Sequence, residues 1–410
     1  PTNSCEADAI QAAIQTALVD QVHVINYSIS GGTNPWAPAD SDRGFLDLVD
    51  AGTFVAASAG NTNAQVTNPI GAVNHRGPWV MTVANSTHDR INKNAIDVDG
   101  GPQDVYSLKS AAPFNADVTA MVADSQVLGN VLGCTSGGGF PPASMTGKIA
   151  LISRGSCSFE EKINNAVAAG AIAVIVYNSN LGQPPILMAV GAATSVPSVM
   201  VARSDGLAIS AHVTNNPNAS ATMHFETVFA LEQSAGDILN AGSLRGPVAG
   251  GIEVTKPDIT APGTNIMAAV AGAPNAYDFL SGTSMSGPHV AGSAALVKGL
   301  RPTWTVPEIR SALMMTASKS GLKDFVNGTP NNGPWDADDV GSGRVDLTKA
   351  ALAGLLMNET KDNFLAAEGD VANQRALNVA SARNTFCTPN CSWTRTVRNA
   401  LSGSSQWSVS

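Results

Sequence analysis

Residues 280–292 read LSGTSMSGPHVAG, and this stretch places Ser284 at the start of an apolar run that predicts a helix. Gly282 allows a sharp turn before the helix and a close approach to a bound molecule. The first backbone N–H groups of a helix lack intrahelical partners and favour negative charge beside them. A serine at this position suits acyl transfer, in which an oxyanion forms next to the nucleophile. A serine hydroxyl is a weak nucleophile without a neighbouring base, so the chain should supply one.

Short apolar strands alternate with helical patterns on both sides of this stretch. Strands and helices in this order predict right-handed crossovers in a parallel sheet, and hence an α/β fold. Ligands of such sheets bind beyond the carboxyl ends of the strands. Strands are predicted at residues 22–29, 54–58, 79–84 and 256–263, and helices at 6–19, at 45–51, after Ser284 and after 341.

The sequence pattern of the middle of the chain differs from that on either side. This difference predicts an inserted domain over 91–228, with its core at 112–226. The parent domain then comprises 1–90 and 229–357. From 358 to 410, SWTRTVRNA and QWSVS alternate apolar and polar residues, which predicts half-exposed strands of a further β domain. Within the insertion, strands are predicted at 148–153, 171–177 and 195–201, and helices at 159–169 and 205–212.

Composition excludes several classes of protein. Charged residues make up only 13% of the 410, the formal net charge is −9, and no basic tract occurs, so nucleic acid is not an expected partner. No apolar run is long enough to span a membrane, and the N-terminus shows no signal peptide. Nothing in the sequence indicates an oligomeric state.

The five cysteines suggest two disulfides. Cys134 and Cys157 bracket one segment, and Cys387 and Cys391 bracket a tight loop. Disulfides indicate an oxidising compartment and a secreted or extracellular protein. Cys5 is left over, either because an upstream partner is missing or because it is a buried free thiol.

The motif around Ser284 is very similar to the active-serine motif of the subtilisin-like serine proteases, the subtilases. Other pieces match that family in the right order: VINYSISGG (24–32), VAASAGN (55–61), SLRGP (243–247, with Leu244 a departure from the usual serine) and KPDITAPG (256–263). The resemblance covers about 1–90 and 229–355. It implies a subtilisin-like parallel sheet flanked by helices.

The resemblance implies roles by position. Ser284 would be the nucleophile of a serine endopeptidase that forms an acyl-enzyme, and Asn61 would donate to the oxyanion together with the Ser284 backbone N–H. Alone, Asn61 would be interpreted as a turn residue after glycine. A peptide substrate would pair with the backbone as an added strand. The residues implied for that pairing are Ser28, Ile29, Ser30 and Gly31, and those implied for one wall of an open specificity pocket are Ser58, Ala59 and Gly60.

The sequence lacks the motifs in which this family carries the base that Ser284 needs. No histidine is followed by Gly-Thr, and no Asp-Thr-Gly or Asp-Ser-Gly run occurs. His289 lies five residues along the same helix, about 140° around from Ser284, so it points away and is interpreted as a helix-packing histidine. His23, His75 and His88 are interpreted as structural or surface residues. The simplest explanation is a fragment that lacks the family's N-terminal aspartate and histidine and is inactive alone.

Residues 147–179 and 196–206 resemble the protease-associated (PA) domain, an α+β, β-rich module that the family often inserts. Cys134 and Cys157 fit the disulfide common in that domain. The segment containing FCTPNCSWTRTV resembles the start of a fibronectin type III-like domain. Asp336, Asp338 and Asp339 carry oxygen ligands that suit a structural calcium ion, although a solvated acidic loop is the preferred interpretation.

Two functional hypotheses follow. The first is a secreted subtilase whose whole protein hydrolyses protein or peptide substrates. The alternative is a non-catalytic peptide-binding pseudoprotease that uses the same cleft and the PA domain. The presence of both Ser284 and Asn61 argues against the alternative, because a binding protein needs neither.

Overall fold

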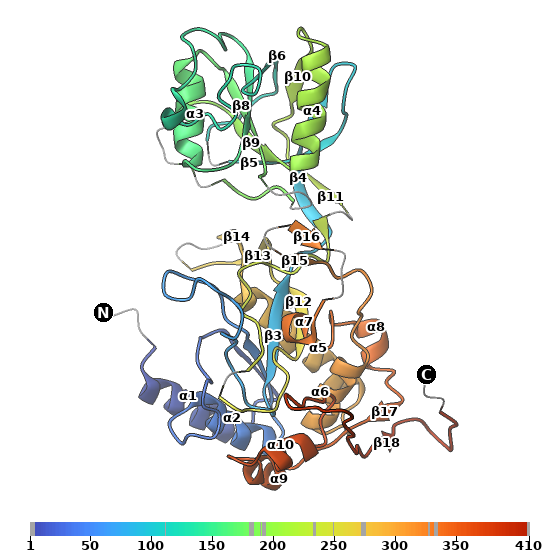
Figure 1. Ribbon diagram of the computed structural model, residues 1–410. Helices are drawn as coiled ribbons and strands as arrows, with labels where there is room; N and C mark the ends of the chain where they lie inside the picture. The colour runs from blue at the N-terminus through green and yellow to red at the C-terminus, as the bar shows by residue number, and fades with distance from the viewer. Residues whose placement is uncertain are drawn as a thin grey trace. The chain divides into compact units, whose positions relative to one another are not determined.

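The computed structural model describes residues 5–110, 112–179, 184–188, 190, 194–232, 235–248, 250–271, 276–326, 329–331 and 335–407. The chain divides into two compact units (Figure 1). The first comprises 1–88, 237–325 and 331–410, and the second comprises 89–236 with 326–330. Among the described helices, none is long and apolar enough to cross a membrane.

The first unit is built on a four-stranded parallel sheet in the order β1–β2–β3–β12. The expected α/β fold with a parallel sheet and helices is therefore confirmed. Strands β3 and β12 are hydrogen-bonded neighbours, and residues 89–236 of the second unit lie in the connection between them. The strands are β1 (Val24–Tyr27), β2 (Phe54–Ser58), β3 (Met81–Ser86) and β12 (Ile259–Pro262).

Helix α5 (Thr283–Leu300) contacts all four strands of this sheet. Its sequence contains a proline and several glycines, which form helices poorly on their own. Packing compensates, because Val290, Ala294 and Val297 recur on one face and are buried against the sheet.

The other helices of the first unit are α1 (Ala7–Val19), α2 (Ser41–Asp50), α6 (Val306–Met315), α7 (Ala337–Val340), α8 (Leu347–Ala350), α9 (Lys361–Ala366) and α10 (Val371–Ala376). Short strand pairs are β13 (Ile266–Ala269) with β14 (Tyr277–Leu280), β15 (Asp324–Val326) with β16 (Thr329–Asn331), and β17 (Leu355–Leu356) with β18 (Arg398–Asn399).

A buried charge network ties β3, β12 and α6 together. Asp258 is 1% exposed, and its Oδ2 accepts hydrogen bonds from Lys256 Nζ at 2.7 Å and from the Thr82 backbone N–H at 2.7 Å. Its Oδ1 accepts from Arg310 on α6. Lys256 is fully buried and also donates to the Val80 carbonyl at 2.7 Å. Burial lowers the pKa of Lys256, and the Asp258 carboxylate opposes that effect.

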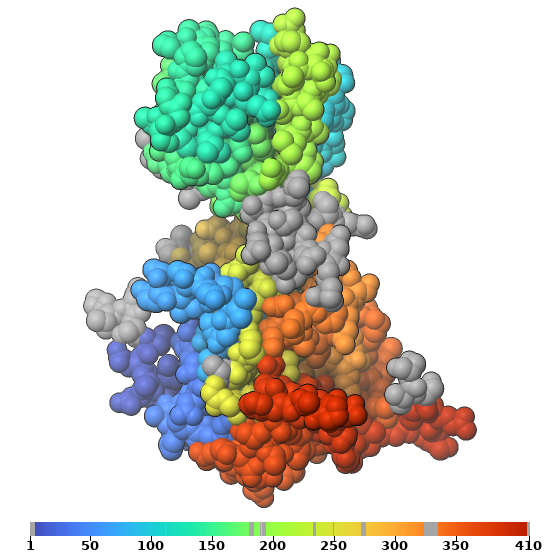
Figure 2. Space-filling view, viewed as in Figure 1, coloured from blue at the N-terminus to red at the C-terminus, as the bar shows by residue number. Residues whose placement is uncertain are grey.

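The C-terminal segment differs from the prediction of a separate β domain beginning at residue 358. Residues 361–376 form α9 and α10, and Phe364, Ala367 and Leu377 join the main hydrophobic core of the first unit. Trp36 Nε1 donates to the Phe364 carbonyl at 2.8 Å. In Figure 2 the orange-red surface of this segment adjoins the blue surface of the N-terminal segment. Of the expected strands, SWTRTVRNA supplies only β18, and Ser408–Ser410 of QWSVS lie outside the described residues.

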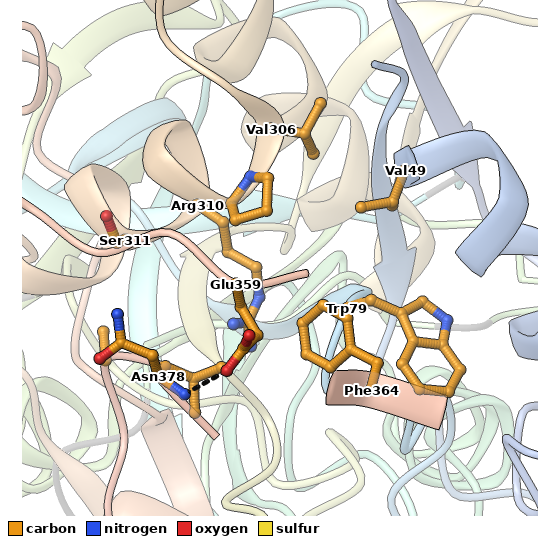
Figure 3. Close-up of a pocket in the computed structure, with 11 residues that line it drawn as sticks. Val49, Trp79, Val306, Arg310, Ser311, Glu359, Phe364 and Asn378 are labelled. Carbon is orange, nitrogen blue, oxygen red and sulfur yellow. Dashed lines mark hydrogen bonds between the residues drawn. The ribbon is translucent and has the colours of Figure 1, made fainter. Parts of the chain in front are cut away.

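Figure 3 shows how closely this segment packs onto the sheet and helices of the first unit. Trp79, Arg310, Glu359, Phe364 and Asn378 are among the residues that line a cavity of only about 10 Å³. That volume is at the lower limit of what one water molecule occupies. The cavity is therefore a packing gap beneath the C-terminal segment, too small for a substrate.

The second unit contains an eight-stranded mixed sheet in the order β10–β6–β7–β8–β9–β5–β4–β11. An additional pairing of β10 with β4 closes the sheet on itself. Helices α3 and α4 lie on opposite sides of it (Figure 1), each covering a separate cluster of buried apolar side chains. Its elements are β4 (Arg90–Val98), β5 (Val105–Lys109), β6 (Val118–Asp124), the 3₁₀ turn η1 (Thr135–Gly137), β7 (Ile149–Ser153), α3 (Phe159–Ala168), β8 (Ala173–Tyr177), β9 (Ser198–Val201), α4 (Arg203–Asn215), β10 (Ser220–Met223) and β11 (Val228–Leu231).

The main segment of the second unit, residues 89–236, extends beyond both ends of the predicted insertion of 91–228. The difference at the second boundary has a clear cause, because β11 pairs with β4 in antiparallel register, with Leu231 opposite Arg90. Residues 229–236 therefore belong with the insertion and not with the parent unit.

Both predicted disulfides are present. Cys134 is bonded to Cys157 and Cys387 to Cys391. Cys5 is a free thiol and is exposed, so its interpretation as a buried thiol is wrong. A buried thiol at that position would have required an apolar cover, and the described residues supply none over Cys5.

Candidate active site

The start of α5 lies against the side chain of Asn61. Thr283 donates its backbone N–H to Asn61 Oδ1 at 2.9 Å, and Thr283 Oγ1 accepts from the Gly60 backbone N–H at 3.1 Å. An N–H group needs an acceptor, so this bond fixes which end of the Asn61 amide faces the helix. Asn61 Nδ2 forms no hydrogen bond with a described residue. A Cβ at Gly282 would lie in ordinary contact with Asn61, 3.4 Å from Oδ1, and the φ of +156° at Gly282 is what favours glycine there.

Helix α5 is also attached to the carboxyl end of β1. Pro288 has no backbone N–H and cannot donate to the carbonyl four residues earlier, which is that of Ser284. Ser28 Oγ donates to this carbonyl instead, at 2.9 Å. Asn26 Nδ2 in turn donates to Ser28 Oγ at 3.0 Å. The backbone of the candidate nucleophile is thus fixed from β1.

The segment after β2 is held rigidly. Gly60 adopts φ +94°, and a Cβ there would lie 2.1 Å from Asn74 Nδ2, so only glycine fits. Ser58 is 2% exposed and Ala59 is fully buried. The Ala59 side chain packs with Val73 in a small apolar cluster and does not line an open pocket. Any contribution of these residues to a pocket wall must therefore come from their backbone.

Residues 28–32 are anchored by hydrogen bonds to residues 75 and 76. His75 Nε2 donates to the Ile29 carbonyl at 2.8 Å, and the His75 backbone N–H donates to the Gly31 carbonyl at 2.9 Å. His75 and Asp42 are fully buried, with Nδ1 2.7 Å from Asp42 Oδ1. The interpretation of His75 as a structural residue agrees with this arrangement.

No described histidine can serve Ser284 as a base in this geometry. His75 has the carboxylate partner that a catalytic histidine needs, but its Nε2 is committed to a carbonyl oxygen that can only accept. Helix packing is the wrong interpretation of His289, because its side chain is exposed and its Nδ1 bonds the Met285 carbonyl. The Ser284 hydroxyl forms no hydrogen bond with any described residue. The others are placed as follows: His23 is exposed, His88 bonds the Asn265 carbonyl, and His212 and His224 belong to the second unit.

The acidic cluster at 336–339 is engaged with the protein and is not a solvated loop. Asp336 caps α7 by accepting from the Asp338 backbone N–H. Asp338 pairs with Arg383 at 2.6 Å, and Asp339 pairs with Arg245 at 3.0 Å. Both arginine partners already balance the negative charge that would attract a calcium ion.

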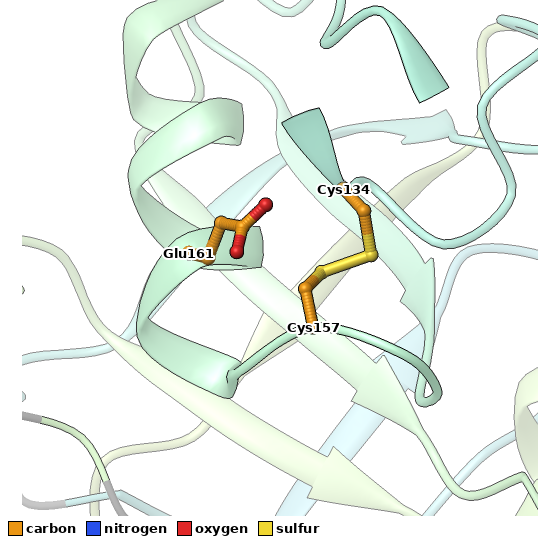
Figure 4. A group of neighbouring side chains, drawn as sticks. All are labelled: Cys134, Cys157 and Glu161. Atoms are coloured by element: carbon orange, nitrogen blue, oxygen red, sulfur yellow. A yellow bond between two sulfur atoms is a disulfide. The ribbon is translucent and has the colours of Figure 1, made fainter. Parts of the chain in front are cut away.

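Among the described residues, one group has the spacing of metal ligands: Cys134, Cys157 and Glu161 (Figure 4). The two sulfurs are bonded to each other, so neither is the thiolate that a metal needs. Glu161 accepts from the Thr135 backbone N–H at 2.9 Å. This group is a structural disulfide and a helix-end contact.

These observations define a serine at a helix N-terminus, an asparagine fixed beside it and an anchored edge segment on an α/β sheet. The model of the subtilase family matches residues 2–343, and the chain belongs to that family of subtilisin-like serine proteases. It is similar to two Arabidopsis thaliana proteins, subtilisin-like protease SBT1.6 (32% identical, covering 88% of this chain and 49% of the relative) and subtilisin-like protease SBT1.7 (31%, 95% and 52%). The chain thus spans about half the length of these curated relatives.

A solved structure of the psychrophilic subtilisin-like protease Apa1 from Pseudoalteromonas sp. AS-11 is also similar. It is 20% identical, has a TM-score of 0.41, and the match covers 85% of this chain and 73% of that one.

Proposed function

We propose that the whole protein is a serine endopeptidase that hydrolyses peptide bonds through an acyl-enzyme on Ser284. The observation that carries this proposal is the fixed Asn61 amide at the start of α5. Its Oδ1 is used by Thr283, so its two Nδ2–H donors face away from that bond. One of these donors and the Ser284 backbone N–H would form a pair of donors for an oxyanion.

In the proposed reaction, Ser284 Oγ attacks the substrate carbonyl carbon while a histidine removes the hydroxyl proton. The carbonyl oxygen becomes an oxyanion and accepts from Asn61 Nδ2 and from Ser284 N–H. The C–N bond then breaks, and the amine leaves with the proton from the histidine. Water hydrolyses the resulting ester by the same steps, which releases the acid and restores Ser284.

We assign peptide binding to residues 28–31. The carbonyls of Ile29 and Gly31 are bonded to His75, whereas those of Ser28 and Ser30 accept no hydrogen bond from a described residue. A substrate strand would pair with Ser28 and Ser30, and Ile29 and Gly31 would hold the segment in place.

The triad aspartate and histidine are proposed to come from a part of the whole protein outside these 410 residues. Two observations support this. Every described histidine is exposed, bonded elsewhere or in the second unit, as set out above. In addition, β1 pairs only with β2 among the described strands, so its other edge is available to a further strand.

We further propose that the second unit is a protease-associated domain. Its support is the closed mixed sheet, the helices on both sides and the Cys134–Cys157 disulfide. The two disulfides also support a secreted protein. The fibronectin type III-like proposal is kept only for the residues after α10, because α9 and α10 belong to the core of the first unit.

Labelling with a fluorophosphonate, which reacts with activated serines, tests the proposal. The chain alone should label slowly or not at all, because no base activates Ser284. Co-expression with the upstream region of the natural gene should restore labelling and peptide hydrolysis. A complemented protein that binds peptides but never labels would favour the pseudoprotease alternative.

Asn61→Ala in the complemented protease should lower kcat by about 10²–10³, with little change in KM, because the donor acts on the transition state. Asn61→Asp separates this role from a structural one, since it keeps an acceptor for Thr283 N–H and removes the donors. It should be as inactive as Asn61→Ala while its Tm stays close to that of the unmodified protein. Asn63→Ala, at an exposed turn residue two positions along, is the control. An unchanged kcat in Asn61→Ala would contradict the oxyanion role.

A further inference from the structure

We propose that His75 is a positioning residue whose charged form holds the peptide-binding segment 28–32 in its working conformation. This inference rests on the proposed function, because it assigns a device to the segment that would bind substrate. Three bonds connect the two segments: His75 Nε2 to Ile29 O, His75 N to Gly31 O at 2.9 Å, and Arg76 N to Gly32 O at 2.8 Å.

The hydrogen-bond pattern fits a doubly protonated ring beside an ionised Asp42 carboxylate. A carbonyl oxygen can only accept, so Nε2, which lies 2.8 Å from Ile29 O, carries a hydrogen. Nδ1 lies 2.7 Å from a carboxylate oxygen of Asp42, and a hydrogen on Nδ1 completes that contact. Removing this hydrogen would leave two lone pairs facing each other in a site that water does not reach.

The surroundings fix the pair in place. Asp42 Oδ2 accepts from the Gly77 N–H at 2.9 Å, and the Trp79 indole donates to the Asp42 carbonyl at 2.6 Å. A Cβ at Gly32 would lie 2.4 Å from Asp42 Oδ1, so the segment rests directly on the ion pair. His75 itself has φ +49°, a left-handed conformation that non-glycine residues rarely adopt. Such strain persists where the surroundings over-determine a residue, often at functional sites.

The charged groups around His75 favour its protonated form. Burial alone would lower its pKa, but Asp42 and the bond to Ile29 raise it above the usual value of 6.5. The carboxylate of Asp40 also stabilises protonated His75, and the buried ammonium group of Lys256 destabilises it. Tyr27 packs its ring edge-on against the imidazole. Because the folded pKa is raised, the stabilisation is complete below about pH 6.5 and is lost as the pH rises through the folded pKa.

The geometry therefore predicts that the segment loosens at alkaline pH and in variants without the imidazolium. In the 410-residue chain, His75→Gln should speed amide hydrogen exchange of residues 28–32 by about 10- to 100-fold, as expected for losing a charge-assisted hydrogen bond. Exchange in β2 should change much less. His23→Gln, at an exposed histidine of the same unit, is the matched control and should change neither.

A second measurement needs no substitution. Imidazole ¹⁵N NMR of the unmodified chain should show both nitrogens of His75 protonated at pH 6. As the pH rises and this doubly protonated signal disappears, amide exchange of residues 28–32, corrected for its intrinsic pH dependence, should become faster. In the complemented protease, His75→Gln should raise KM more than it lowers kcat. A singly protonated ring at pH 6, unchanged exchange in His75→Gln, or an unchanged KM in an active protease would each overturn the proposal. A complemented protein that never hydrolyses peptides, yet shows the exchange effect, would refute the proposed function and leave the anchoring role of His75 intact.

Discussion

Ser284→Ala should abolish fluorophosphonate labelling of the complemented protease and lower its kcat by about 10⁶, the loss measured when the nucleophile of such a triad is removed. Folding should be unaffected for two reasons. The Ser284 hydroxyl has no bonding partner among the described residues, and the bond from Ser28 goes to the Ser284 carbonyl, which alanine keeps. The urea midpoint should therefore match that of the unmodified protein.

The motif contains its own control for this experiment. Ser286 lies two residues further along α5, is fully buried, and its hydroxyl has no hydrogen-bond partner among the described residues. Ser286→Ala should retain labelling and hydrolysis, because it removes only an unsatisfied polar atom. Labelling that survives in Ser284→Ala, or that disappears equally in both variants, would remove Ser284 from the proposed mechanism.

Asp258→Ala should destabilise the first unit by about 3–5 kcal/mol, because it leaves the cations of Lys256 and Arg310 buried without their counter-charge. It also removes the acceptor of the Thr82 backbone N–H, a bond of 2.7 Å from β3 to the residue just before β12. Urea unfolding followed by tryptophan fluorescence measures this loss, since all six tryptophans lie in the first unit: Trp36, Trp79, Trp304, Trp335, Trp393 and Trp407.

Asp47→Ala is the control for charge removal. Asp47 pairs with Arg43 and Lys361, but its side chain is 35% exposed, so water screens the pairs. Exposed pairs contribute about 0–1 kcal/mol, and the urea midpoint should shift little. If Asp258→Ala were as mild as Asp47→Ala, the buried network would not be what joins β3, β12 and α6.

The parallel sheet could be predicted from the sequence because its signals are local. Strand β2, FVAAS, is apolar except for Ser58 at its end and is buried throughout, and α1 repeats apolar residues four apart. Helices α9 and α10 escaped prediction because each has only six residues, and few residues give little periodicity. Their place in the core is decided by tertiary contacts such as Phe364 against Trp79.

The candidate site was predictable only where a family motif marks it. Ser284 and Asn61 lie in such motifs, and the structure brings them together. Thr283, which bonds both Gly60 and Asn61, was missed, as was the bond between Ser28 and the Ser284 carbonyl. Pro288, four residues after Ser284, was the available signal for that bond, because a proline there frees a carbonyl. The role of His75 depends on Asp42, 33 residues away, and no local pattern links the two.

The antiparallel pairing of β4 with β11 has a consequence for how the chain folds. Pairing of β3 with β12 closes a loop that contains residues 89–236 of the second unit. The entropy cost of closing a loop increases with its length. Once β11 pairs with β4, Leu231 lies opposite Arg90, and the effective loop shrinks to the short segments on either side. That shortening reduces the closure cost by about 1–2 kcal/mol. During refolding, amide hydrogens of the inserted unit should therefore become protected from exchange before those of the parallel sheet. The pairing of β4 with β11 would then precede the pairing of β3 with β12.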